Sequence, residues 1–130
     1  MKMRAYAAAV GACCVTVAAM AADFDGSKTL MCATVHALDC PSGSECVKGR
    51  AAQLGAPPFM RINFEQKTIA GPKRSTPIVF LDRTEGQVLL QGSEIGYGWT
   101  LALDTLDGSM SATLVNREGA FVLFGQCTPL

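Results

Sequence analysis

The fold is decided by residues 97–115, with the sequence YGWTLALDTLDGSMSATLV. The first half of this stretch alternates apolar Trp99, Leu101 and Leu103 with more polar neighbours, which is the period of two of a half-buried strand. The second half alternates in the same way. Between the halves lies an Asp-Gly pair at positions 107–108, a strong signal for a tight hairpin turn. The stretch therefore predicts two antiparallel strands that share one apolar face.

Short strands and turns continue on both sides of this hairpin. Residues 40–58 are rich in glycine and proline and predict a loop. Strands are expected at residues 29–38, 59–65, 76–82, 87–91, 97–104, 109–115 and 120–127. About seven short strands joined by glycine-bearing turns predict an all-β antiparallel meander, either a small barrel or a two-sheet sandwich.

The N-terminus has the features of an export signal. Lys2 and Arg4 give a basic start, and residues 5–19 form an uncharged apolar run. The segment Ala19-Met20-Ala21 then supplies small residues at both key positions of a cleavage site. We therefore predict a signal peptide over residues 1–21 and a single β domain over residues 22–130, located in the periplasm or secreted.

The same N-terminal residues allow two alternatives to cleavage. A transmembrane anchor needs about 20 apolar residues, and this alanine-rich run is shorter and only weakly apolar. Lipid attachment at Cys13 is suggested by residues 10–13, which loosely resemble a lipobox, although the apolar run before Cys13 is only about two helical turns long. We adopt cleavage after Ala21, and lipidation at Cys13 stays open.

The charge of the expected domain argues against two kinds of partner. Removal of residues 1–21 takes away two of the eleven basic side chains, so nine remain against eleven acidic ones. Such a domain has no electrostatic reason to bind nucleic acid. No later stretch reaches about 18 consecutive apolar residues, so we expect no membrane insertion of the mature chain. Lys73, Arg74 and Arg83 lie in predicted turns and are interpreted as solvated charges.

Four cysteines follow the signal peptide, and an even number in a small exported domain predicts two disulfides. Cys40 and Cys46 flank residues 41–45, a turn-rich loop that can bring their Cα atoms to bonding distance. Between Cys32 and Cys40 the chain has no glycine or proline to reverse it, and an extended or helical segment holds these two residues too far apart. We therefore expect the pairs Cys40–Cys46 and Cys32–Cys127.

The spacing of the cysteines does not favour metal or redox chemistry. Structural zinc sites bring their ligands as close pairs of the C-x₂₋₄-C kind, whereas this chain has C-x₇-C, C-x₅-C and one distant cysteine. Neither a CxxC nor a CxxCH motif is present. We predict no metal and no cofactor.

The most suggestive candidate site is Gly96-Tyr97-Gly98-Trp99. It holds the only tryptophan and one of the two tyrosines of the chain, next to glycines that permit tight backbone bends. A lone tryptophan in a small β domain is most often the largest residue of the core. Tyr97 and Trp99 are the predicted binding residues, and for Tyr97 the sequence leaves core packing and ligand contact equally open.

His36 is the only histidine of the chain. In a regular strand it would share a face with Cys32 and Leu38. A hydrolase would need His36 as its base beside a carboxylate such as Asp104 or Glu94, but no G-x-S-x-G motif accompanies it. We predict no catalytic residue and keep a small hydrolase as the alternative.

The C-terminal half of the chain carries several motifs, which are Leu89-Leu90-Gln91-Gly92, Trp99-Thr100-Leu101, Met110-Ser111-Ala112-Thr113 and Phe121-x-x-Phe124-Gly125-x-Cys127. With these motifs, and with Cys32, Cys40 and Cys46, the chain resembles a group of small uncharacterised secreted proteins of Gram-negative bacteria. The resemblance covers most of the expected domain. It implies export and disulfides, and it assigns no activity and no site residue.

The expected function follows from fold class and compartment alone. Small exported β domains stapled by disulfides often act as inhibitors or binding modules. We therefore expect a non-enzymatic domain that binds an envelope protein or a small apolar ligand.

Overall fold

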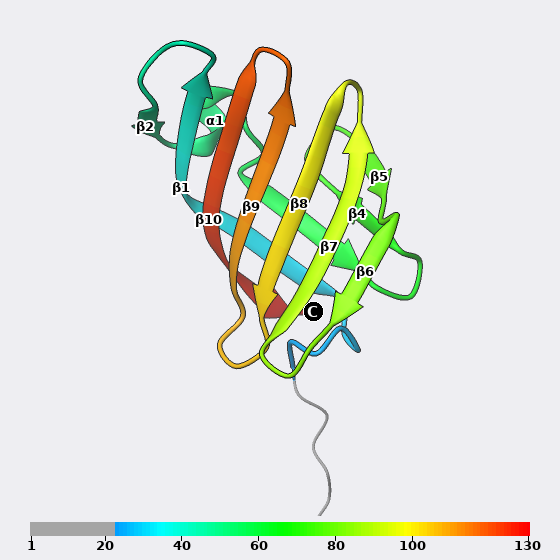
Figure 1. Cartoon of the computed structure of the whole chain (residues 1–130). Helices are drawn as coiled ribbons and strands as arrows, with labels where there is room; N and C mark the ends of the chain where they lie inside the picture. The colour runs from blue at the N-terminus through cyan, green and yellow to red at the C-terminus, as the bar shows by residue number, and fades with distance from the viewer. Residues whose placement is uncertain (1–22) are drawn as a thin grey trace, which may run out of the picture.

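The computed structural model describes residues 23–130, which form an all-β domain (Figure 1). The predicted signal peptide, its cleavage site and Cys13 lie outside the described residues. The elements are β1 (Leu30–Pro41), β2 (Val47–Gly49), α1 (Ala51–Leu54), β3 (Phe59–Asn63), β4 (Thr68–Ala70), β5 (Ser75–Pro77), β6 (Phe80–Arg83), β7 (Gln87–Glu94), β8 (Tyr97–Asp104), β9 (Ser109–Asn116) and β10 (Gly119–Pro129).

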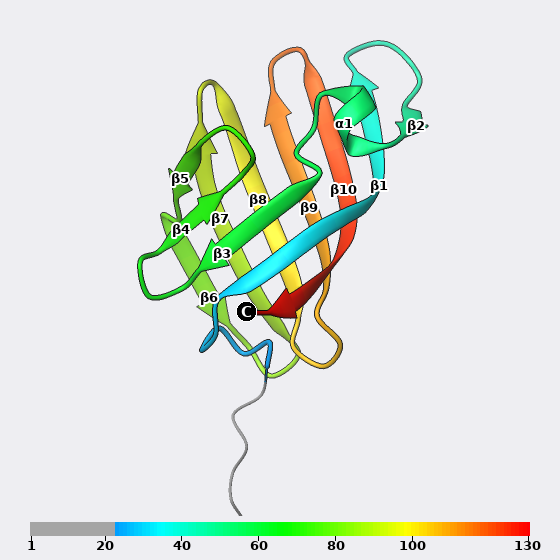
Figure 2. The same ribbon diagram turned by 180° about the vertical axis from the view of Figure 1, so that it is seen from behind.

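All strands belong to one antiparallel sheet with the order β5-β4-β3-β1-β10-β9-β8-β7-β6, and β2 pairs with β1 beside this path. The sheet curls, so that β3, β4 and β5 form a back layer behind β7, β8 and β9 (Figures 1 and 2). The predicted all-β antiparallel fold is confirmed. The sequence left open whether the fold is a small barrel or a two-sheet sandwich. The structure is a half-barrel, in which one curled sheet forms both layers.

The described chain has ten strands, more than the seven or so expected, because one expected strand is divided and short ones were missed. Residues 76–82, predicted as one strand, contribute to β5 in the back layer and to β6 in the front layer. The backbone N–H of Ile78 donates to the carbonyl of Lys67, whereas the N–H of Val79 donates to the carbonyl of Gln91. The chain thus crosses from one layer to the other between these two residues.

A β-bulge in β1 decides which of its side chains face the interior. Thr34 pairs with Gly125 and His36 pairs with Phe124, which leaves Val35 as the extra residue. Because one residue is added, the alternation of faces reverses beyond this point. The prediction that His36 shares a face with Cys32 is wrong, since Cys32 is buried and His36 is exposed.

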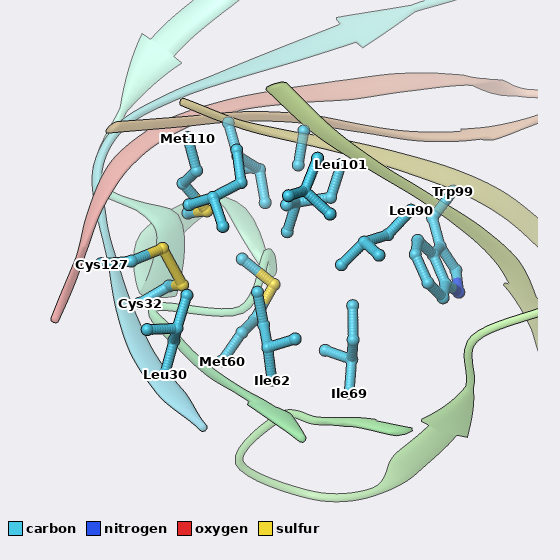
Figure 3. Packing of buried hydrophobic residues seen from close by; sticks show 14 of the residues in the cluster. Leu30, Cys32, Met60, Ile62, Ile69, Leu90, Trp99, Leu101, Met110 and Cys127 are labelled. Carbon is cyan, nitrogen blue, oxygen red and sulfur yellow. A yellow bond between two sulfur atoms is a disulfide. The ribbon is translucent and has the colours of Figure 1, made fainter. Parts of the chain in front are cut away.

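The core lies between the two layers. Side chains from the back layer, among them Ile62 and Ile69, point toward Leu90 and Leu101 of the front layer (Figure 3). In β7, β8 and β9 every second residue contributes, as the period of two in the sequence predicts.

Both predicted disulfides are confirmed. Cys32 and Cys127 are cross-strand partners on β1 and β10, buried in the core with their Cα atoms 3.9 Å apart. Cys40 and Cys46 close the exposed loop between β1 and β2, with a Cα separation of 4.1 Å. Two bonded pairs leave none of these four cysteines as a thiolate ligand for zinc.

The end of the half-barrel near the start of β1 is covered by residues 23–28, a short lead-in to that strand. Phe24 packs against the core and lies close to Gly108 in the turn between β8 and β9. The guanidinium of Arg83 donates to the carbonyls of Asp25 and Gly26 at 3.1 and 3.2 Å. The lead-in therefore belongs to the folded domain.

Within residues 23–130, no helix has the length and apolar character needed to cross a membrane. The two disulfides are compatible with an extracellular or otherwise oxidising compartment.

Candidate functional site

A cavity of about 520 Å³ lies between the two layers of the curled sheet. Its floor is the concave face of β8 and β9. One wall comes from the loop between α1 and β3, and the other from the turn between β4 and β5. The view from behind shows β8 and β9 passing above β3, between α1 and β5, where the back layer does not cover them (Figure 2).

The interior of this cavity is apolar. Trp99 and Leu101 of β8 and Leu114 of β9 line the floor, and Met60 and Ile69 line it from the back layer. Strand alternation points all three floor residues inward. Binding sites for small molecules enclose roughly 300–1,000 Å³ and are lined mainly by apolar side chains. The cavity therefore has the size and lining of such a site.

Trp99 is fixed by contacts with β5 and β7. Its cross-strand partner is Gly92, whose missing side chain leaves room for the indole ring. The indole Nε1–H donates to Oγ1 of Thr76 at 3.4 Å, and the Thr76 hydroxyl donates to the carbonyl of Ser93 at 3.0 Å. With 9% of its surface exposed, Trp99 is a rigid part of the cavity floor.

Charged groups gather at the rim of the cavity. Lys73 and Arg74 come from the turn between β4 and β5, and Glu94 comes from the end of β7. Nε of Arg74 lies 3.4 Å from Oε1 of Glu94. This oxygen is buried and accepts no hydrogen bond from the described residues, so the two groups form an ion pair of poor hydrogen-bond geometry. The rim thus carries two cations and one anion.

The hairpin between β7 and β8 brings a strained residue to the rim. Glu94 pairs with Tyr97, so Ile95 and Gly96 form a two-residue loop, and both have positive φ angles of 41° and 79°. Such loops favour Asn-Gly, because a β-branched side chain is strained at positive φ. Ile95 is nevertheless present, lines the cavity mouth, and is 73% exposed. Strain of this kind is typical of functional positions.

Tyr97 connects the cavity with a second, more polar hollow of about 220 Å³. This hollow lies at the same end of the front layer and is lined by Asp39, Asn116, Glu118 and Phe121 as well as Tyr97. Tyr97 is half-buried and faces both spaces. Its side chain therefore stands at the boundary between the apolar interior and polar surroundings.

Both residues predicted for binding, Tyr97 and Trp99, line the cavity, and strand alternation places them on the same face of β8. The expectation that Trp99 is buried also agrees with the structure. Sequence reasoning assigned no binding role to Lys73 and Arg74, which were interpreted as solvated charges. The only signal for them was their adjacency in a turn that precedes an edge strand, which does not show where the turn lies.

The residues of the alternative hydrolase do not come together. His36 lies on the convex face of the sheet beside Phe124, whereas Glu94 lines the cavity on the concave side. Asp104 serves the turn between β8 and β9, where its Oδ1 accepts the backbone N–H of Leu106 at 2.7 Å. Neither carboxylate is therefore placed to assist His36.

Asp107 also serves this turn, and its Oδ1 accepts the backbone N–H of Ser109 at 2.8 Å. The hydrogen bonds from the backbone and side chain of Ser109 lower the pKa of Asp107 below its ordinary value. Among residues 23–130, no group of three or more His, Cys, Asp and Glu side chains could hold a metal ion.

Comparisons of this chain with protein-family models, with curated proteins and with solved structures gave no match. The described residues form an antiparallel half-barrel, cross-linked by two disulfides, with an apolar cavity that opens at a charged rim.

Proposed function

We propose that the protein is a non-enzymatic binding domain of the periplasm or of the secreted fraction, and that it holds a small apolar ligand in the cavity between its layers. The observation that carries this proposal is the cavity itself, which combines apolar walls with an open mouth. Exposed apolar surface is costly in water, because each Å² left uncovered forfeits roughly 25 cal/mol of burial free energy. A ligand that covers this surface recovers that free energy.

The rigidity of the cavity floor supports the same proposal. A ligand binds more tightly to a preformed site, since no free energy is spent on ordering the side chains around it. Trp99 is fixed through Thr76 and Gly92, and the buried Cys32–Cys127 disulfide joins β1 to β10 in the same core. The floor around Trp99 is therefore already ordered before a ligand binds.

The proposed compartment rests on the N-terminal sequence and on the disulfides. The predicted signal peptide over residues 1–21 would direct the chain through the inner membrane. Disulfides persist outside the reducing cytoplasm. The resemblance to small secreted proteins of Gram-negative bacteria points the same way.

A second candidate function is the binding of an envelope protein through the hairpin between β7 and β8. Ile95 favours it, because an exposed, strained apolar side chain at a hairpin tip can insert into a pocket of a partner. A photoreactive side chain at position 95 would test this candidate by crosslinking in envelope extract. One saturable adduct supports a protein partner, and the absence of any adduct argues against it.

The experiment for the ligand-binding function is a titration of the oxidised protein with phenylnaphthylamine, a neutral apolar dye whose emission rises in apolar surroundings. Ala112 lies on the cavity floor, so Ala112→Phe should fill the cavity and abolish saturable binding. The matched control is Ala102→Phe on the convex face of β8, where the added ring does not enter the cavity. Equal dye binding by both variants would refute the proposal.

A further inference from the structure

The cavity rim has more positive than negative groups, and this excess of positive charge bears on the chemistry of the ligand. Arg74 is opposed by Glu94, but Lys73 has no acidic partner among the described residues. The mouth of an apolar cavity therefore carries one surplus positive charge. Charges around a concave, apolar site act on a ligand more strongly than they would in bulk water, because the surrounding dielectric constant is lower.

The guanidinium of Arg74 has unused hydrogen-bonding capacity. An arginine side chain offers five N–H donors in a planar fork. Within residues 23–130, the Arg74 side chain donates no hydrogen bond, and its one charged contact is through Nε to Glu94. The two terminal nitrogens are therefore free to donate together to a carboxylate, the arrangement in which arginine binds this group best.

We infer that the ligand of the cavity is an amphiphile with an apolar body and a single carboxylate, which Arg74 and Lys73 bind at the rim. This inference rests on the proposed ligand-binding function and adds the class of the ligand. The apolar body lies against Trp99, Leu101 and Leu114, and the carboxylate remains at the mouth, where it keeps part of its hydration. Such a division matches the lining, which is apolar inside and has its charged groups, with a net positive charge, at the rim.

Glu94 limits the ligand to one negative charge. Its carboxylate lies at the same rim and contacts the same guanidinium, so it competes with the ligand for Arg74. A doubly charged head group such as a phosphate monoester would face this repulsion twice over. A head group with a single charge gains the contact to Lys73 and Arg74 at the lowest repulsive cost.

The test compares three ligands with the same twelve-carbon chain, namely dodecanoate, dodecanol and dodecylammonium. Each is titrated into the oxidised protein at neutral pH by isothermal titration calorimetry, below the concentration at which it forms micelles. We expect dodecanoate to bind most tightly and dodecylammonium most weakly. Arg74→Gln should weaken dodecanoate binding by roughly tenfold or more, because charge-assisted hydrogen bonds are lost, and should leave dodecanol binding unchanged.

Two further variants separate the role of the rim from a general loss of structure. Glu94→Gln should strengthen dodecanoate binding, by roughly two- to fivefold, because it removes the competitor for Arg74. A purely structural role of Glu94 would give the opposite sign. The control Arg61→Gln removes an exposed charge from β3 that does not line the cavity, and it should bind dodecanoate as the parent protein does.

The outcomes distinguish failure of this inference from failure of the proposed function. If dodecanol binds as tightly as dodecanoate and Arg74→Gln changes neither, the carboxylate inference is overturned while the cavity remains a binding site. Tightest binding of dodecylammonium would also overturn it and would assign the head group to Glu94. If none of the three ligands binds, both the inference and the proposed function are wrong.

Discussion

The indole ring of Trp99 packs directly over the backbone of Gly92, its cross-strand partner on β7. A Cβ atom at Gly92 would clash with this ring and would also lie 2.6 Å from the carbonyl oxygen of Pro77 on β5. Three strands from both layers thus meet at a position where only glycine fits. The curl of the sheet and the placement of Trp99 in the cavity wall depend on the same contact.

Gly92→Ala should therefore destabilise the protein by at least about 2 kcal/mol, because the ring and the β5 backbone would both have to move. Gly98→Ala on β8 is a close control, since a Cβ there would be 3.9 Å from its nearest neighbour, a side-chain carbon of Val115. Urea unfolding of the two variants measures the difference. Equal midpoints would show that Gly92 is not required for the closure of the layers.

The strained hairpin predicts a gain of stability. Ile95→Asn should stabilise the protein by about 1 kcal/mol, or raise Tm by about 4 °C, because asparagine tolerates the positive φ of this loop. Ile95→Val keeps the β-branched carbon and should give no gain. Thermal unfolding followed by circular dichroism tests both. If the asparagine variant melts no higher than the parent protein, the strain at Ile95 is not costly.

The fold could be predicted largely from local signals, and the exceptions have one physical cause. Alternation and an Asp-Gly turn suffice for β8 and β9, since a hairpin is determined by its own residues. The crossing between Ile78 and Val79 depends instead on hydrogen bonds to Lys67 and Gln91. No local pattern encodes these partners.

The same distinction applies to the candidate site. Tyr97 and Trp99 stood out because they are one of two tyrosines and the only tryptophan of the chain, next to glycines that permit tight backbone bends. Arg74 and Glu94 are twenty positions apart in the sequence and meet only because the sheet curls. The inward direction of Cys32 and the outward direction of His36 likewise required knowledge of the bulge at Val35. Long-range contacts therefore determine which charged residues meet at the rim, whereas the aromatic residues of the cavity could be picked out from the sequence.

The two disulfides should contribute unequally to stability. In the chain-entropy model the Cys32–Cys127 bond, which joins residues 95 positions apart, contributes about 4–5 kcal/mol, whereas the six-residue separation of Cys40 and Cys46 gives about 2 kcal/mol. Replacing each pair by alanine and measuring urea unfolding tests this order. An equal loss for both pairs would show that loop length does not govern their contribution.

Accessibility predicts which disulfide is reduced first. Cys46 is exposed, whereas Cys32 and Cys127 are buried in the core. Mild reduction of the folded protein should therefore open Cys40–Cys46 before Cys32–Cys127. Alkylation followed by peptide mass spectrometry identifies the thiols that appear first. Early labelling of Cys127 would contradict the buried position of that bond.

Acid should weaken the turn between β8 and β9. The pKa of Asp107 is lowered in the folded state, by hydrogen bonds from the backbone and side chain of Ser109, relative to its ordinary value of 3.8. Because its pKa is lower in the folded state, ionised Asp107 stabilises the protein fully above the ordinary value of 3.8. This contribution is lost as the pH falls through the folded-state pKa. The stability of Asp107→Asn should thus fall less steeply than that of the parent protein below pH 3.8. Parallel acid titration curves, followed by circular dichroism, would contradict this.

A small apolar molecule should enter the cavity beside Trp99, and one measurement tests this entry directly. Trp99 is the only tryptophan of the chain, so its fluorescence reports on the cavity wall without interference from other sites. The protein is titrated with dodecanol brominated at its terminal carbon, because bromine quenches indole emission on contact. We expect saturable quenching at one ligand per chain. Quenching that rises without saturation, as it does for free tryptophan in solution, would contradict it.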